Sequence, residues 1–235
     1  MKNLKIGIIG AMNEEVVELT TMIEDRRTRL VAGMTFNEGR IKGRDVVVVE
    51  CGIAKVNAAM CTQILISEFG VGALINTGVA GALNENLNIN DVVISTDAIQ
   101  YDVDASSLGD PKGSIPRMKT SVFVADSRLI DMAYESFLEE KSDYRAYKGR
   151  VVTGDKFVAS LEEKTYLREA FNGYCCEMEG GAIAHVAHCN GLPFVIIRAI
   201  SDKADKSAEL AYDEFVKRAA ETSKDMVLNI LAKIG

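Results

Sequence analysis

Long apolar runs are missing from this chain of 235 residues, and no stretch approaches the ~20 apolar residues that a membrane-spanning helix needs. Hydrophobic residues nevertheless make up 48% of the sequence and charged residues 26%, a balance typical of globular domains. The opening MKNLKIGIIG also lacks the apolar core and small-residue cleavage site of a signal peptide. We therefore expect a soluble, cytoplasmic protein.

No C-x-x-C pair occurs, and the five cysteines are an odd number, which argues against a disulfide framework or a cysteine-bound zinc ion. Four of them lie in apolar segments and are predicted to be reduced core thiols. His185 and His188 are three residues apart on a predicted helix, but no third ligand has suitable spacing. We predict no metal site.

Blocks of basic charge are absent as well. The 27 Lys and Arg residues are scattered among 34 Asp and Glu residues, and the formal net charge is −7. This favours a small-molecule substrate over nucleic acid. No Ser, Gly or Pro tract and no repeat divides the chain, so the sequence predicts a single domain over residues 1–235.

Apolar, β-branched segments are abundant. Several are continuous rather than alternating, as is typical of strands buried on both faces; they are KIGIIG, DVVVVECG, GALINTG, DVVISTDA, GRVVTGD, YCCEME and PFVIIRAIS. Helical periodicity is clearest over residues 55–68, 126–139, 160–171, 179–190 and 208–233. This order predicts an α/β fold with a parallel or mixed sheet between helices, and TFNEGRIKGRDVVVVECG is predicted to form a hairpin that joins it.

Polar residues at strand ends are the candidate site, because α/β sheets bind ligands beyond the carboxyl ends of their strands. Asp202 directly follows LPFVIIRAIS, and Glu177 and Glu179 flank Met178 after another strand. Glu15 interrupts an apolar helix face, where burial would raise its pKa and suit it to act as a general base.

Each of these residues also has a structural interpretation. Glu15 could be solvated at the edge of its helix face, Asp202 could cap a turn, and Glu179 could be a helix-start acid. The segment GIIGAMNEE is an incomplete dinucleotide-binding fingerprint, since no acidic residue ends a strand about 20 residues on.

Five motifs together resemble those of one family. GIIGAMNEEV, INTGVAGAL, VVTGDKF, CEMEGGAIAHV and RAISDKAD, spread over residues 6–205, are similar to those of the bacterial 5′-methylthioadenosine/S-adenosylhomocysteine nucleosidases, within the nucleoside phosphorylase/nucleosidase superfamily. The resemblance implies a single-domain α/β sandwich with a central mixed, partly barrel-like sheet flanked by helices, and a homodimer. It also implies hydrolysis of the N-glycosidic bond to adenine, in 5′-deoxyadenosine as well, without metal or organic cofactor.

The resemblance assigns roles to individual residues. Glu15 activates the attacking water, Asp202 beside Ser201 is the general acid toward adenine N7, and Glu179 binds the ribose hydroxyls. Phe157 stacks on adenine. The other residues expected to bind substrate are Met12, Val79, Ala80, Gly81, Val158, Glu177, Met178 and Tyr212.

Some positions depart from the family pattern. Val79 stands where a serine is usual, and Gln100 with Tyr101 replaces a tyrosine-histidine pair before Asp102. The segment 104–116 is similar to a loop that reaches into the partner's site, so Leu108 and Pro116 are expected to line the neighbouring subunit's 5′-substituent pocket.

Three alternatives remain at this stage. A purine nucleoside phosphorylase would need arginines to hold phosphate, and neither GIIGAMNEEV nor NTGVAGAL contains one. An aminodeoxyfutalosine nucleosidase differs only in the 5′-substituent that it accepts. A noncatalytic nucleoside-binding protein could use the same fold, although the presence of Glu15, Glu179 and Asp202 together argues against it.

Overall fold

The computed structural model describes residues 4–139, 143–205 and 208–234, with the backbone alone over 208–214 and at 216 and 217. The strands are β1 (Ile6–Gly10), β2 (Glu24–Val31), β3 (Met34–Ile41), β4 (Arg44–Glu50), β5 (Ala73–Ala82), β6 (Val92–Gln100), β7 (Val122–Val124), β8 (Ala146–Thr153), β9 (Gly173–Glu177) and β10 (Phe194–Asp202). The helices are α1 (Asn13–Thr21), α2 (Lys55–Phe69), the 3-10 turn η1 (Ser106–Leu108), α3 (Ser127–Glu139), α4 (Leu161–Phe171), α5 (Gly180–Cys189) and α6 (Ala208–Lys233).

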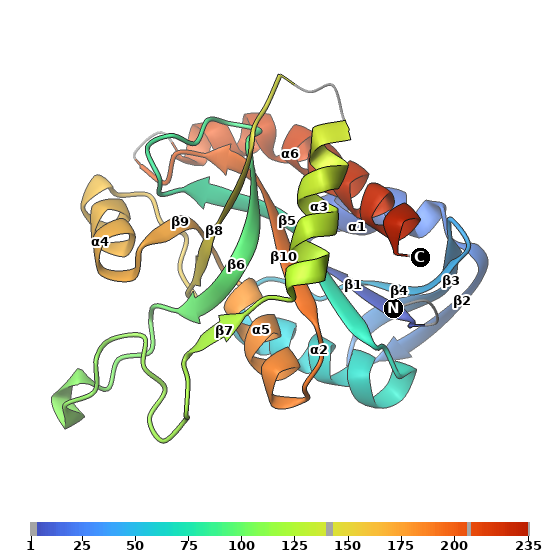
Figure 1. Cartoon of the computed structure of the whole chain (residues 1–235), viewed down its shortest axis with the longest axis horizontal. Helices are drawn as coiled ribbons and strands as arrows, with labels where there is room; N and C mark the ends of the chain where they lie inside the picture. The colour runs from blue at the N-terminus through green and yellow to red at the C-terminus, as the bar shows by residue number, and fades with distance from the viewer. Residues whose placement is uncertain (1–3, 140–142, 206–207, 235) are drawn as a thin grey trace.

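The central sheet closes on itself (Figure 1). Strand β10 pairs with β5 and β6, β8 joins β6 to β9, and β9 pairs back to β5, which makes a ring of five strands. From β5 the sheet continues outward as a wing through β1, β4, β3 and β2. Three of the pairs around the ring are parallel and two are antiparallel, so the prediction of a mixed, partly barrel-like sheet is confirmed.

Helices cover the sheet in two packed groups. α2 packs on α5, whereas α1 and α3 both pack on α6, which lies against β5 and β10. Every residue of β1, β5 and β10 is buried, which explains why their sequences are nearly continuous apolar runs. Burial on both faces leaves their carboxyl ends as the places where polar side chains reach a cavity.

The predicted helices and the β3–β4 hairpin agree with the structure to within one or two residues at most ends. Strand β2, with the sequence EDRRTRLV, was missed. Its side chains are almost all exposed, so no alternation of apolar and polar residues marks it. Charged side chains along such an edge strand also discourage pairing with other molecules.

The cysteines agree with the prediction of reduced thiols. All five are free, and all but Cys189 are buried. His185 and His188 lie against the ring of Phe123. Across the ranges that the structure describes, no helix combines the length and the apolar character that crossing a membrane requires.

Candidate active site

A cavity of about 560 Å³ opens at the carboxyl ends of β1, β5, β9 and β10. The parallel pairs β1–β5 and β5–β10 bring these strand ends together although they are far apart in the sequence. Twelve of the predicted site residues line the cavity: Met12, Glu15, Val79, Ala80, Gly81, Phe157, Val158, Glu177, Met178, Glu179, Ser201 and Asp202. The lining also includes Ala11, Ile53, Lys156 and Cys176, which the sequence did not single out.

Two further predicted residues were assigned to the pocket of a partner subunit. Leu108 is 80% exposed and Pro116 is exposed, and neither lines the cavity of its own chain. The side chain of Tyr212 lies outside the described residues.

Glu15 folds back onto the start of its own helix. Its Oε2 accepts hydrogen bonds from the N–H groups of Ala11 at 2.6 Å and Met12 at 3.1 Å, and its Oε1 accepts one from Val79 at 3.1 Å. Helix N-termini offer such unpaired donors and favour negative charge. The carboxylate is 4% exposed, so the interpretation of Glu15 as a solvated edge residue is wrong.

Burial raises the pKa of Glu15, and this desolvation outweighs the opposing effects of Arg198 and the three N–H donors. Two glycines make room for the carboxylate. A Cβ at Gly78 would lie 2.6 Å from Glu15 Oε1, and one at Gly10 would lie 3.0 Å from Glu15 Cβ. These two strand glycines therefore leave the space that the Glu15 side chain occupies.

Asp202 is the last residue of β10 and follows a shift in register against β5. Its Oδ1 accepts a hydrogen bond from the N–H of Ala204 at 2.8 Å, and its Oδ2 accepts one from Ser201 Oγ at 2.9 Å. The first contact is an Asx turn, so Asp202 is a turn residue and also lines the cavity. Burial raises its pKa.

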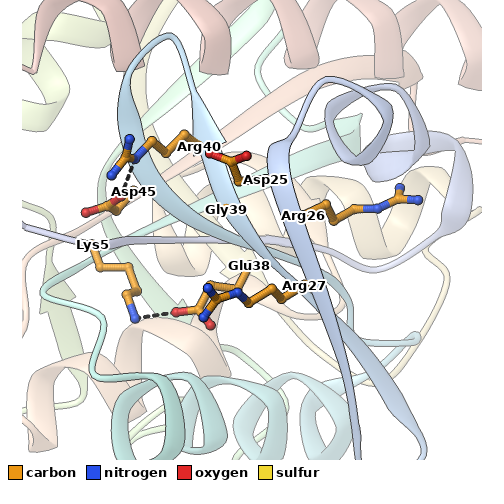
Figure 2. A pocket seen from close by; sticks show the side chains of 8 residues that line it. All are labelled: Lys5, Asp25, Arg26, Arg27, Glu38, Gly39, Arg40 and Asp45. Atoms are coloured by element: carbon orange, nitrogen blue, oxygen red, sulfur yellow. Dashed lines mark hydrogen bonds and ion pairs between the residues drawn. The ribbon is translucent and has the colours of Figure 1, made fainter.

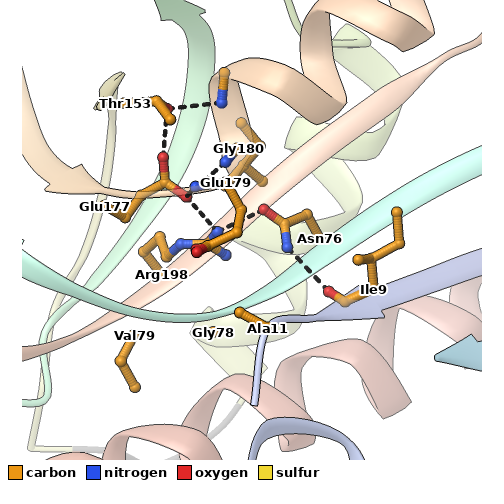
Figure 3. A network of polar contacts seen from close by, with 12 residues as sticks. Ile9, Ala11, Asn76, Gly78, Val79, Thr153, Glu177, Glu179, Gly180 and Arg198 are labelled. Atoms are coloured by element: carbon orange, nitrogen blue, oxygen red, sulfur yellow. Dashed lines mark hydrogen bonds and ion pairs between the residues drawn. The ribbon is translucent and has the colours of Figure 1, made fainter. Parts of the chain in front are cut away.

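A buried arginine lies at the centre of a polar network that includes the cavity residue Glu177 (Figure 3). Arg198 Nη2 lies 2.5 Å from both Glu177 Oε2 and Asn76 Oδ1, and its side chain is 2% exposed. Glu177 also accepts hydrogen bonds from Thr153 Oγ1 and from the N–H of Gly180. Removing one partner of a buried ion pair typically lowers the free energy of unfolding by about 3–5 kcal/mol. The main contribution of Glu177 is therefore to hold Arg198 in place.

Sequence reasoning missed Arg198 and Asn76. The available signal was a charged residue inside the buried run PFVIIRAIS, because unpaired charges are rarely buried. Arg198 Nε is buried and has no hydrogen-bond partner among the described residues. A buried donor of this kind needs a ligand or a water molecule to satisfy it.

Glu179 lies beside this network and is 6% exposed. Its Oε1 accepts a 2.8 Å hydrogen bond from the N–H of Ala54. Burial and the neighbouring Glu177 carboxylate raise the pKa of Glu179. Val158 is buried and Phe157 is 43% exposed, and both residues line the cavity.

A second hollow lies on the wing formed by β2, β3 and β4 (Figure 2). It is lined by Lys5, Asp25, Arg26, Arg27, Glu38, Gly39, Arg40 and Asp45. Its charges largely neutralise one another, because Lys5 Nζ lies 2.5 Å from Glu38 and Arg40 Nε lies 3.3 Å from Asp45. It lacks the apolar walls typical of small-molecule sites, so the strand-end cavity is the better candidate.

Comparison with known proteins gives the family. The model of the phosphorylase superfamily matches residues 5–232, and the 5′-methylthioadenosine/S-adenosylhomocysteine nucleosidase of Halalkalibacterium halodurans is 41% identical over 232 residues, which is 98% of this chain and 99% of that protein. The chain belongs to this nucleosidase family of the phosphorylase superfamily.

Solved structures agree with this assignment. The Neisseria meningitidis nucleosidase of the same name, in complex with methylthio-immucillin-A, has a TM-score of 0.94 at 37% identity and covers 99% of this chain and 100% of that chain. The futalosine hydrolase of Helicobacter pylori has a TM-score of 0.92 at 32% identity, with 98% of each chain covered. The resemblance seen in the sequence motifs is therefore confirmed at the level of the whole fold.

Val79 lies where the sequence resemblance leads us to expect a serine. Its backbone N–H holds Glu15, a contact that does not depend on the side chain. The side chain is 9% exposed, lines the cavity and packs with Ala199 and Ala219. The substitution makes this wall of the cavity more apolar and leaves the contact of Val79 with Glu15 in place.

Proposed function

We propose that the protein hydrolyses the N-glycosidic bond of 5′-methylthioadenosine and S-adenosylhomocysteine, as well as 5′-deoxyadenosine, and releases adenine and the 5-substituted ribose. One observation carries this proposal: two buried carboxyl groups with raised pKa values, Glu15 and Asp202, line one cavity from opposite ends of the chain. The names of the relatives support the choice of substrate.

The two carboxyl groups divide the reaction between them. Asp202 donates a proton to adenine N7 as the glycosidic bond breaks, so that adenine leaves as a neutral base. Glu15 accepts a proton from the water that attacks the oxocarbenium-like sugar, much as paired carboxyl groups act in inverting glycosidases. A raised pKa suits both roles, because each group must exchange a proton near neutral pH.

The remaining residues orient the substrate. Glu179 accepts hydrogen bonds from the ribose hydroxyls and stabilises developing positive charge on the sugar. Arg198 Nε, an unsatisfied donor, holds the attacking water or a ribose oxygen. Phe157 stacks on the base, and the backbone of Val158 reads its edge. No metal or organic cofactor takes part in these steps.

Hydrolysis is favoured over phosphorolysis by the contacts of Arg198. Its guanidinium is bound to Glu177 and Asn76, so its charge is already neutralised and is not available to hold phosphate.

We expect adenine to be released from 5′-methylthioadenosine at the same rate with and without phosphate, measured by chromatography of the products. A strict phosphate requirement with a ribose-1-phosphate product would contradict the assignment.

An aminodeoxyfutalosine nucleosidase is the second candidate, because the futalosine hydrolase of H. pylori has a closely similar fold. The two activities differ in the group at the 5′ position. Steady-state kinetics with 5′-methylthioadenosine, S-adenosylhomocysteine and aminodeoxyfutalosine decide between them. A chain that binds all three without releasing adenine is a binding protein instead.

We also propose a homodimer that covers the apolar face of α2. Val56 and Met60 lie one turn apart on this face with 76% and 37% exposure, and Ile53 beside them is 50% exposed and lines the cavity. Such an exposed patch is typical of an interaction surface. In this arrangement Leu108 and Pro116 reach the partner's cavity.

Sedimentation analysis is expected to give twice the 25.6 kDa chain mass, and Val56→Glu is expected to lower the measured mass to that of the single chain.

A cytoplasmic location is the remaining part of the proposal. The four buried cysteines are free thiols, as is typical of proteins in a reducing compartment. Cell fractionation tests this point, and recovery from a secreted fraction would count against it.

A further inference from the structure

The turn that enters α2 is held in a strained conformation. Ala54 has φ of 81° and ψ of 163°, a region that glycine adopts readily and alanine does not. Its N–H donates the 2.8 Å hydrogen bond to Glu179, 125 residues later in the chain. Strain of this kind persists where surrounding contacts fix the backbone, and it is concentrated at functional sites.

The next residue, Lys55, makes two further links in the same place, and a third joins its two partners. The N–H of Lys55 donates a 2.8 Å hydrogen bond to Asp155 Oδ1, and Lys55 Nζ lies 2.5 Å from Asp102 Oδ1. The N–H of Asp155 in turn donates a 3.0 Å hydrogen bond to Asp102 Oδ2. The start of α2, the turn after β6 and the loop after β8 are therefore joined through Lys55, Asp102 and Asp155.

These links start at residues next to the cavity. Ile53 precedes Ala54 and Lys156 follows Asp155, and both line the cavity, whereas Lys55 does not. The loop over residues 155–158 then continues to the residues that the proposed function places against adenine. The start of α2 is thus bonded to the ribose side of the site through Ala54 and to the base side through Lys55.

We propose that Lys55 is a positioning residue that acts through Asp102 and Asp155 to hold the adenine-binding loop, residues 155–158, at a fixed spacing from Glu179. This inference rests on the proposed nucleosidase function. The side chains of Lys55 and Asp102 are 17% and 29% exposed, so solvent screens this ion pair less than one on the open surface. Without the cation, Asp102 loses the ion pair that ties it to the start of α2, and the loop that its other oxygen holds through the N–H of Asp155 shifts.

The test is Lys55→Met, which keeps the aliphatic stem and removes the charge. We expect KM for 5′-methylthioadenosine to rise about tenfold with kcat within about threefold, since the base contacts contribute equally to ground state and transition state. The dissociation constant of adenine, measured by calorimetry, should rise in the same proportion. Lys55→Arg, which retains the cation, should restore KM to within about threefold of wild type.

Two further variants complete the design. Lys148→Met is the matched control, because Lys148 Nζ forms a comparable 2.7 Å ion pair with Asp131 that is not part of the cavity, and its KM should equal that of wild type. Asp102→Asn keeps the shape of the side chain and should reproduce the rise in KM. The double variant with Lys55→Met should raise KM no further, because the two residues act as one unit.

The possible results separate the two proposals. An active wild-type enzyme whose Lys55→Met and Asp102→Asn variants keep their KM and adenine affinity overturns the positioning role, even if their melting temperatures fall, since that is what a purely structural ion pair would give. A wild-type protein that releases no adenine from any of the three nucleosides overturns the proposed function, and the positioning role with it.

Discussion

Asp202→Asn is expected to lower kcat/KM for 5′-methylthioadenosine by about 10²–10⁴-fold, the usual contribution of a general acid. The amide cannot donate the proton that adenine N7 needs. The fold should be retained, because an asparagine oxygen still accepts from the N–H of Ala204 and its NH₂ group can donate to Ser201 Oγ. Steady-state kinetics and a thermal melt of the same preparation measure both effects.

The pH dependence gives an independent check. Burial raises the pKa of Asp202, so the protonated form that acts as acid persists to higher pH than in an exposed aspartate. Wild-type kcat/KM should fall as pH rises through this pKa, and Asp202→Asn should lack that alkaline limb. Asp131→Asn, at an exposed position, is the control with unchanged activity. Near wild-type turnover in Asp202→Asn would mean that the residue only forms a turn.

Glu15→Gln is expected to reduce kcat by about 10²–10⁴-fold, because an amide cannot accept a proton from the attacking water. Three N–H groups converge on this carboxylate, from Ala11, Met12 and Val79. The single oxygen of a glutamine side chain can accept hydrogen bonds on one side only. Its NH₂ group then faces an N–H donor on the other side, and the free energy of unfolding should fall by about 1–3 kcal/mol. Stopped assays for adenine and urea unfolding measure the two effects.

Binding separates chemistry from a general loss of structure. Adenine should still bind Glu15→Gln with an affinity near that of wild type, because Glu15 acts on the water rather than on the base. The raised pKa of Glu15 predicts that wild-type kcat/KM falls as pH drops through it, since a base must be ionised. Glu14→Gln, at the exposed neighbouring position, serves as the control. Loss of adenine binding in Glu15→Gln would contradict the assigned role.

The strand and helix positions could be predicted because their signals are local. Continuous apolar runs predict buried strands, and β5 and β10 follow such runs closely. The end of the last run marks the end of β10, which is why Asp202 could be selected as a site residue before its neighbours were known. Glu15 could be selected because it interrupts an apolar helix face.

Other features depend on residues far apart in the sequence. The ring closes where β10 pairs with β5, and β2 is a strand only because β3 pairs with it. The role of Arg198 follows from Glu177 and Asn76, which meet it from two other strands. No local pattern contains these pairings.

The sequence by itself determined the class of fold, the strand ends and the types of chemical group placed there, because each depends on neighbours within a few residues. Only the tertiary structure decided which of those groups share a cavity and how far the pKa of each is shifted. The hydrogen bond from the strained Ala54 backbone to Glu179 and the raised pKa values of Glu15 and Asp202 are features that only the tertiary structure sets. Burial and electrostatic environment are set by contacts between distant segments, and these exist only once the ring of strands has closed.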